Sequence, residues 1–170
     1  KLLSVTGGVP RYLELINPVL SAEENIRAMC FSKSGALLGE FKRIFSDVFG
    51  KRSQVYRRIV TTLVSGSLSQ EEILSRLGRT KTGDISEYLS DLVLAGIVVR
   101  DYTWLLDSEN VSKLSKYRLK DNYVRFYLKY ISPNLLRIDQ GLFDNRSLAS
   151  LTAYEAILGL QFENLVVNNA

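Results

Sequence analysis

The chain has 170 residues, of which 46% are hydrophobic and 24% are charged, and its formal net charge is +4. This hydrophobic content is sufficient for a packed core and excludes a disordered chain, and without a run of about 18 apolar residues the sequence predicts no membrane-spanning helix. Histidine is absent and Cys30 is the single cysteine, which excludes histidine-based catalysis and zinc sites built from these residue types within the chain.

The first fifty residues predict a short helical region. Gly7 and Gly8 permit a tight turn, and Pro10 suits the first turn of the helix that follows. Arg11 falls in that turn, where free backbone N–H groups attract anions. Ser21 and Glu24 have the spacing of a capping box and predict the next helix. The spacing alone favours a glycine turn before an ordinary helix, with Arg11 in solvent, over an anion site.

Residues 55–119 predict three helices followed by two strands, the order typical of a winged helix. The expected elements are helices over Val55–Ser65, from Ser69 to Gly78 and from about Thr80 to Gly96, then strands Ile97–Tyr102 and Lys116–Leu119, separated by a polar loop, Asp107–Ser115. Ser69 and Glu72 form another capping box. Apolar residues recur at helical spacing through the third helix.

After the second strand, helical spacing places four aromatic residues on one side of a further helix: Tyr123, Phe126, Tyr127 and Tyr130. Such a stripe is typical of core packing. Pro133 predicts the end of this helix, and residues 147–168 predict another one.

Several stretches, taken in order, carry a resemblance to a known family. The segment GGVPRYLELI at residues 7–16 resembles the sensor-2 segment in the lid of archaeal-type AAA+ ATPases, a family also found in bacteria. Residues 20–26 and 35–41 resemble later lid helices, and residues 56–60 the start of that family's winged helix. The run YRLKDNYVRFYLKYISPN at residues 117–134 is similar to the segment that follows the wing. Residues 160–166 resemble the opening helix of a nuclease-like domain.

The resemblance implies a mainly α fold. We expect a helical lid remnant at residues 1–50, a winged helix with its trailing helix at 51–132 and a partial nuclease-like region at 133–170. Gly8, Pro10 and Arg11 would contact nucleotide, and Glu163 is a candidate nuclease carboxylate. The phosphate loop Gly-x-x-x-x-Gly-Lys-Ser/Thr is absent, so we interpret the chain as part of a longer ATPase that binds ATP and Mg²⁺ elsewhere, and we expect no hydrolysis by these residues alone.

The winged-helix segment predicts weak contact with double-stranded DNA. In such folds the third helix enters the major groove and the wing contacts phosphate. The candidate residues are Arg79, Lys81, Ser86, Lys113, Lys116 and Arg118. Residues 55–120 contain ten basic and eight acidic residues, including Asp84, Glu87 and Asp91 in the third helix. This balance predicts weak, sequence-independent binding.

Two alternatives remain open from the sequence. The segment could be a DNA-binding transcription regulator without ATPase ancestry, or a protein-interaction module that holds an ATPase to its partner. Self-association would then occur through the ATPase core. The single cysteine favours a reducing compartment, and we expect a cytoplasmic protein.

Overall fold

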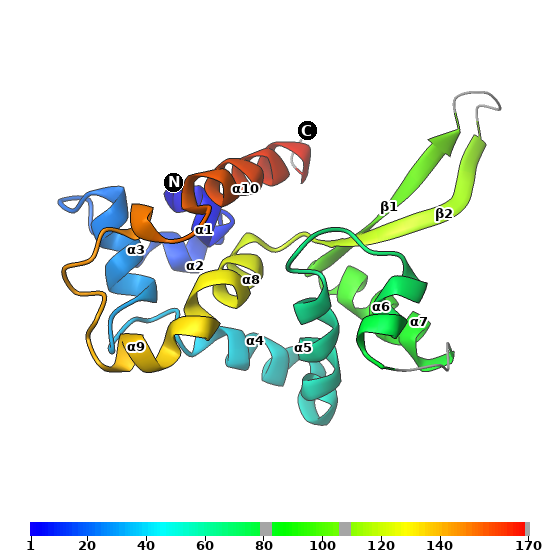
Figure 1. Ribbon diagram of the computed structural model, residues 1–170, viewed down its shortest axis with the longest axis horizontal. Coiled ribbons are helices and arrows are strands. Elements are labelled where there is room, and N and C mark those ends of the chain that lie inside the picture. Colours follow the sequence, from blue (N-terminus) through cyan, green and yellow to red (C-terminus); the bar gives the residue numbers. More distant parts are fainter. Residues whose placement is uncertain (79–82, 106–109, 169–170) are drawn as a thin grey trace. The chain divides into compact units, whose positions relative to one another are not determined.

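A computed structural model describes residues 1–78, 83–105 and 110–168. As the sequence predicts, the described part is mainly helical, with a two-stranded antiparallel sheet. The chain forms two compact units, whose elements are shown in Figure 1. Unit 1 joins Lys1–Ile44 to Asn122–Ala170, and unit 2 is Phe45–Asp121.

Unit 1 is built from short helical elements at both ends of the chain. They are α1 (Leu2–Thr6), α2 (Pro10–Leu13), α3 (Ala22–Cys30), α8 (Asn122–Phe126), the π-helical η2 (Tyr127–Ile131), the 3-10 turns η3 (Ser132–Asn134) and η4 (Leu148–Ser150), α9 (Leu135–Asp139) and α10 (Tyr154–Asn168). Helix α4 (Glu40–Phe49) runs from unit 1 into unit 2. The predicted capping box of Ser21 and Glu24 is present at the start of α3.

Aromatic side chains form much of the core of unit 1. Phe31 stacks on Phe143 with ring centroids 4.9 Å apart, and it meets Phe126 edge-on at 6.1 Å. The rest of the predicted aromatic stripe is also buried: Tyr123, Tyr127 and Tyr130. Because this stripe packs within unit 1, residues 122–131 belong to that unit. The sequence analysis instead places them at the end of the winged-helix region, residues 51–132. The structure likewise joins residues 133–170 to the N-terminal segment.

A buried polar cluster connects three helices of unit 1. Asn122 Nδ2 donates to the backbone oxygen of Gln161 at 2.9 Å, and Asn164 Nδ2 donates to Asn122 Oδ1 at 2.7 Å. The Gln161 amide donates to the backbone oxygens of Ser4 and Asn122. Leaving one buried polar group of this kind without a partner costs about 1–3 kcal/mol. The cluster therefore holds α1, α8 and α10 together, and Figure 1 shows α1 beside α10.

Unit 2 contains three main helices and a hairpin. Its elements are the end of α4, the 3-10 turn η1 (Gly50–Arg52), α5 (Ser53–Thr62), α6 (Gln70–Arg76), α7 (Gly83–Leu94), β1 (Val98–Leu105) and β2 (Asn110–Leu119). Helix α6 begins with the predicted capping box of Ser69 and Glu72. The core includes a cluster of fully buried side chains from the three helices and from the residue that caps the end of α5: Ile59, Leu63, Ile73, Ile85 and Leu89. The predicted start of the third helix, at Thr80 or Thr82, lies outside the described residues.

The hairpin is longer than the sequence predicts. Strand β2 begins at Asn110, so the expected loop Asp107–Ser115 is wrong over its second part. Backbone pairing requires no apolar side chains, and a polar segment can therefore extend a ladder that reaches into solvent. Val98 pairs with Leu119 at the buried base, and Trp104 pairs with Val111 further out, beyond an irregularity after Tyr102. Figure 1 shows the two strands side by side over this length.

A third chain segment pairs with the hairpin. The N–H of Leu68 donates to the oxygen of Tyr117 at 2.9 Å, and the N–H of Tyr117 donates back to Leu68 at 2.7 Å. Leu68 lies between α5 and α6, and both side chains are buried. This bridge fixes the hairpin against the helices of unit 2.

Among residues 1–78, 83–105 and 110–168, no helix combines the length and the hydropathy that crossing a lipid bilayer requires.

Candidate functional site

The glycine turn before α2 has the backbone that the sequence predicts. Gly7 and Gly8 have positive φ values of 67° and 75°, which residues with a Cβ atom rarely adopt. Val9 is extended, and Pro10 then opens α2. Gly8, Pro10 and Arg11 are thus brought together in one exposed turn of unit 1.

The residue after Arg11 anchors this turn. Tyr12 is 5% exposed, and its hydroxyl donates to Glu40 Oε1 at 3.0 Å. Its ring lies 5.4 Å from the Tyr123 ring. Arg11 itself is exposed and has no carboxylate within 4.0 Å among the described residues. The turn therefore presents an uncompensated cation on a fixed backbone.

The predicted DNA-contacting residues of unit 2 lie on two elements. Ser86 is on α7, where its hydroxyl accepts a hydrogen bond of 2.9 Å from the side chain of Gln70. Lys116 and Arg118 are on β2 and share one face of that strand, two positions apart. Arg79 and Lys81 lie outside the described residues, as does the side chain of Lys113.

Nearby carboxylates reduce the positive charge of the hairpin. Arg118 Nε donates to Asp101 Oδ2 at 2.6 Å across the two strands. Lys116 is the direct register partner of Asp101. The pKa of Glu72 is lowered chiefly by the backbone N–H of Ser69, with a smaller contribution from the charge of Lys116. Lys116 and Arg118, the two predicted DNA contacts that the structure describes on the hairpin, therefore face acidic groups of the same unit.

Two acidic residues of α7 are engaged inside unit 2. Asp91 accepts a short hydrogen bond from the Tyr56 hydroxyl, and burial together with that carboxylate raises the pKa of Tyr56. Glu87 lies 3.5 Å from Arg52 on the surface. Asp84 is exposed at the start of α7. These contacts direct Asp91 toward α5 and leave Asp84 to oppose an approaching phosphate.

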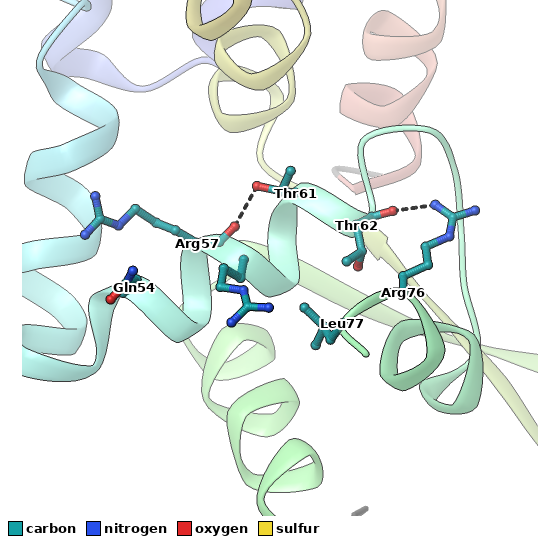
Figure 2. A pocket seen from close by; sticks show the side chains of 7 residues that line it. Gln54, Arg57, Thr61, Thr62, Arg76 and Leu77 are labelled. Carbon is teal, nitrogen blue, oxygen red and sulfur yellow. Dashed lines mark hydrogen bonds between the residues drawn. The ribbon is translucent and has the colours of Figure 1, made fainter. Parts of the chain in front are cut away.

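An open pocket of about 400 Å³ lies between α5 and the end of α6, and the sequence analysis did not predict it. Figure 2 shows its lining, which contains three arginines and no carboxylate: Gln54, Arg57, Arg58, Thr61, Thr62, Arg76 and Leu77. The available signal was the spacing of the α5 residues. Positions 54, 57, 58 and 61 follow the i, i+3, i+4, i+7 pattern of one helix face, here a polar one.

Glu163 is exposed on α10, between the buried residues Gln161 and Asn164. In the part of the chain that the structure describes, no group of three or more potential metal-ligating residues comes together. Among the described residues, Glu163 therefore belongs to no three-residue group of the kind that could hold the metal ions of a nuclease centre.

Comparisons with known proteins give one informative similarity. Over 110 residues, or 65% of this chain, the sequence is 34% identical to an uncharacterized protein of Methanocaldococcus jannaschii. The match covers 24% of that protein, so the chain matches about a quarter of this relative's length. No family model and no solved structure matches the sequence.

Proposed function

We propose that unit 2 is a winged helix that binds double-stranded DNA weakly and without sequence preference. The observation that carries this proposal is the bridge between Leu68 and Tyr117. With it, the order along the chain becomes helix, bridging residue, helix, helix and hairpin. In a winged helix, the hairpin is the wing and the helix before it is the one that reads the groove.

The charge distribution supports weak binding. Phosphate contacts supply most of the affinity of a DNA-binding protein. On the hairpin, Arg118 is paired with Asp101, and Asp84 stands at the start of α7. The described part of α7 contains no arginine, asparagine or glutamine that could make bidentate hydrogen bonds to a base. Binding would therefore be dominated by the backbone of the duplex.

We further propose that the chain is part of an AAA+-type ATPase, in which nucleotide state is coupled to this winged helix. The order of the resembling segments supports the assignment, as does the glycine turn that presents Arg11. Gly8, Pro10 and Arg11 would face the phosphates or base of ATP. The phosphate loop and the Mg²⁺ ligands would be supplied by other residues of the parent protein, and Glu163 would belong to its nuclease-like region.

The DNA proposal is tested by titrating the complete 170-residue chain with two unrelated duplexes over a range of salt concentrations. We expect similar affinities for both duplexes, and log affinity that falls against log salt by about 0.9 for every phosphate neutralised. Lys116→Glu should weaken binding, whereas Lys33→Glu, an exposed lysine of unit 1, should have a smaller effect. A strong preference for one duplex, or a salt-independent complex, would contradict the proposal.

A protein-interaction role is the second candidate, and α10 favours it. Four large apolar side chains of this helix are each about half exposed or more: Leu160, Phe162, Val166 and Val167. Exposed apolar groups of this kind mark interaction surfaces when they are contiguous. Absence of duplex binding even at low salt would favour this second role.

A further inference from the structure

The three arginines of the pocket in Figure 2 differ from the cations that the sequence singled out. We call Arg57, Arg58 and Arg76, with the polar groups between them, the arginine strip. None of the three has a carboxylate within 4.0 Å among the described residues, whereas Arg118 pairs with Asp101 at 2.6 Å. The strip therefore keeps its positive charge available, with Glu72, one turn before Arg76, as the nearby acidic group.

Neutral oxygen atoms hold two of the guanidinium groups in place. Arg57 donates to the backbone oxygen of Ser53 at 3.3 Å and to its hydroxyl at 3.2 Å. Arg76 Nη1 donates to the backbone oxygen of Thr62 at 2.9 Å. A guanidinium has five N–H donors, so each group retains donors for a ligand. These contacts orient the two arginines without neutralising them.

The arrangement of the strip indicates an extended anion. In Figure 2 the side chains of Arg57 and Arg76 point to opposite ends of the lining, with Thr61 and Thr62 between them. Side chains that point to opposite ends offer contacts at two separate places, an arrangement that suits a chain of phosphates. Arginine, threonine and glutamine are among the side chains that contact phosphate and sugar oxygens in protein–DNA complexes.

We propose that the arginine strip binds the sugar–phosphate backbone of duplex DNA, as a second contact region separate from α7 and the hairpin. This inference rests on the proposed DNA binding by unit 2 and identifies the residues that supply its phosphate contacts. Because phosphate contacts carry no sequence information, the strip adds affinity and salt dependence without base preference.

The test compares four variants of the complete chain in duplex binding at several salt concentrations. The strip variant carries Arg57→Gln, Arg58→Gln and Arg76→Gln. The charge-matched control carries Lys33→Gln, Lys129→Gln and Arg137→Gln, which are exposed residues of unit 1. The hairpin variant is Lys116→Gln. Arg58→Gln alone is the fourth variant, because no hydrogen bond among the described residues involves that side chain, and its melting temperature separates a lost contact from lost folding.

We expect the strip variant to bind at least tenfold more weakly at low salt, with a log–log salt slope shallower by about 2.7 if three phosphates are lost. Arg58→Gln should reduce the slope by about 0.9, with an unchanged melting temperature. The control triple should bind much closer to wild type.

Three results would overturn the inference. If the strip variant binds DNA as tightly as wild type while Lys116→Gln weakens binding, the arginine strip does not contact DNA, and the proposed DNA binding by unit 2 stands. If the control triple loses as much affinity as the strip variant, general charge explains the binding. If the wild-type chain binds no duplex but binds ATP through the arginine strip, the strip serves a nucleotide, and the proposed DNA binding fails as well.

Discussion

The backbones of Leu68 and Tyr117 exchange two hydrogen bonds, at 2.9 and 2.7 Å, and so join the segment before α6 to the outgoing strand of the hairpin. The side chain of Leu68 is 6% exposed at this junction. The junction links the helices of unit 2 directly to its wing.

Because the Leu68 side chain is buried, Leu68→Ala should destabilise the protein by about 2–4 kcal/mol, as other buried leucine truncations do, although alanine can still make both backbone hydrogen bonds. Chemical denaturation monitored by circular dichroism measures the change. Leu94→Ala is the matched control, because Leu94 is 89% exposed and its loss should cost less than about 0.5 kcal/mol. Equal effects of the two substitutions would mean that the Leu68 side chain adds no packing energy at this junction.

Asp101→Asn should increase the affinity for duplex DNA. The substitution removes the charge that opposes Arg118, so that arginine becomes available to a phosphate and the salt slope should steepen by about 0.9. Fluorescence anisotropy at several salt concentrations measures both quantities. Asp139→Asn, an exposed aspartate of unit 1, makes the same change in net charge. An increase of the same size in that control would show that Arg118 contributes no specific contact.

If the chain is part of an ATPase, as proposed, Arg11→Ala in that longer protein should reduce ATP hydrolysis more than it reduces stability. Losing a cation directed at phosphate removes about 2–4 kcal/mol of transition-state stabilisation in comparable sites. Arg11 is exposed, so the melting temperature should change little. Turnover and melting are measured for this variant beside Lys33→Ala. Normal turnover in Arg11→Ala would reject a sensor role for this residue.

Glu23 should make part of the stability of unit 1 dependent on pH. The backbone N–H of Leu148 donates to Glu23 Oε1 at 2.8 Å and is the main reason that the pKa of this carboxyl is lowered, with Arg27 contributing. Because the folded pKa lies below the unfolded value, the stabilisation is present above about pH 4.5 and is lost as the pH falls through the folded pKa.

Glu23→Gln should therefore melt at a lower temperature than wild type at neutral pH, and the difference should shrink as the pH falls through the folded pKa of Glu23, because the wild-type side chain then becomes neutral as well. Melting curves across this range provide the measurement, with Glu14→Gln as an exposed control. A difference between Glu23→Gln and wild type that stays constant with pH would refute the assignment.

Local patterns in the sequence predicted much of the secondary structure. Both predicted capping boxes, at Ser21 and Ser69, are present. Each could be predicted because it depends only on two residues three positions apart. The aromatic stripe from Tyr123 to Tyr130 is buried. Helical spacing alone places those residues on one face of the helix. The predicted elements are thus most accurate where the determining contacts are short-range.

Long-range packing determined what the sequence did not predict. On α10, the polar residues Gln161 and Asn164 are buried while Phe162 is 56% exposed, the reverse of a hydrophobic pattern. Only the partners Ser4 and Asn122, far away along the chain, explain this arrangement. The pocket between α5 and α6 was missed for a related reason, since Arg76 reaches Thr62 only after the two helices have packed.

The polar cluster around Asn122 also has a consequence for biosynthesis. Ser4 and Gln161, which it joins, are 157 positions apart, whereas unit 2 is a continuous stretch of chain. A ribosome therefore releases all of unit 2 before unit 1 can complete its core, and domains generally fold as units during synthesis. We expect unit 2 to fold first. Residues 1–44 then stay unfolded, and accessible to chaperones and proteases, until residues 122–170 have been synthesised.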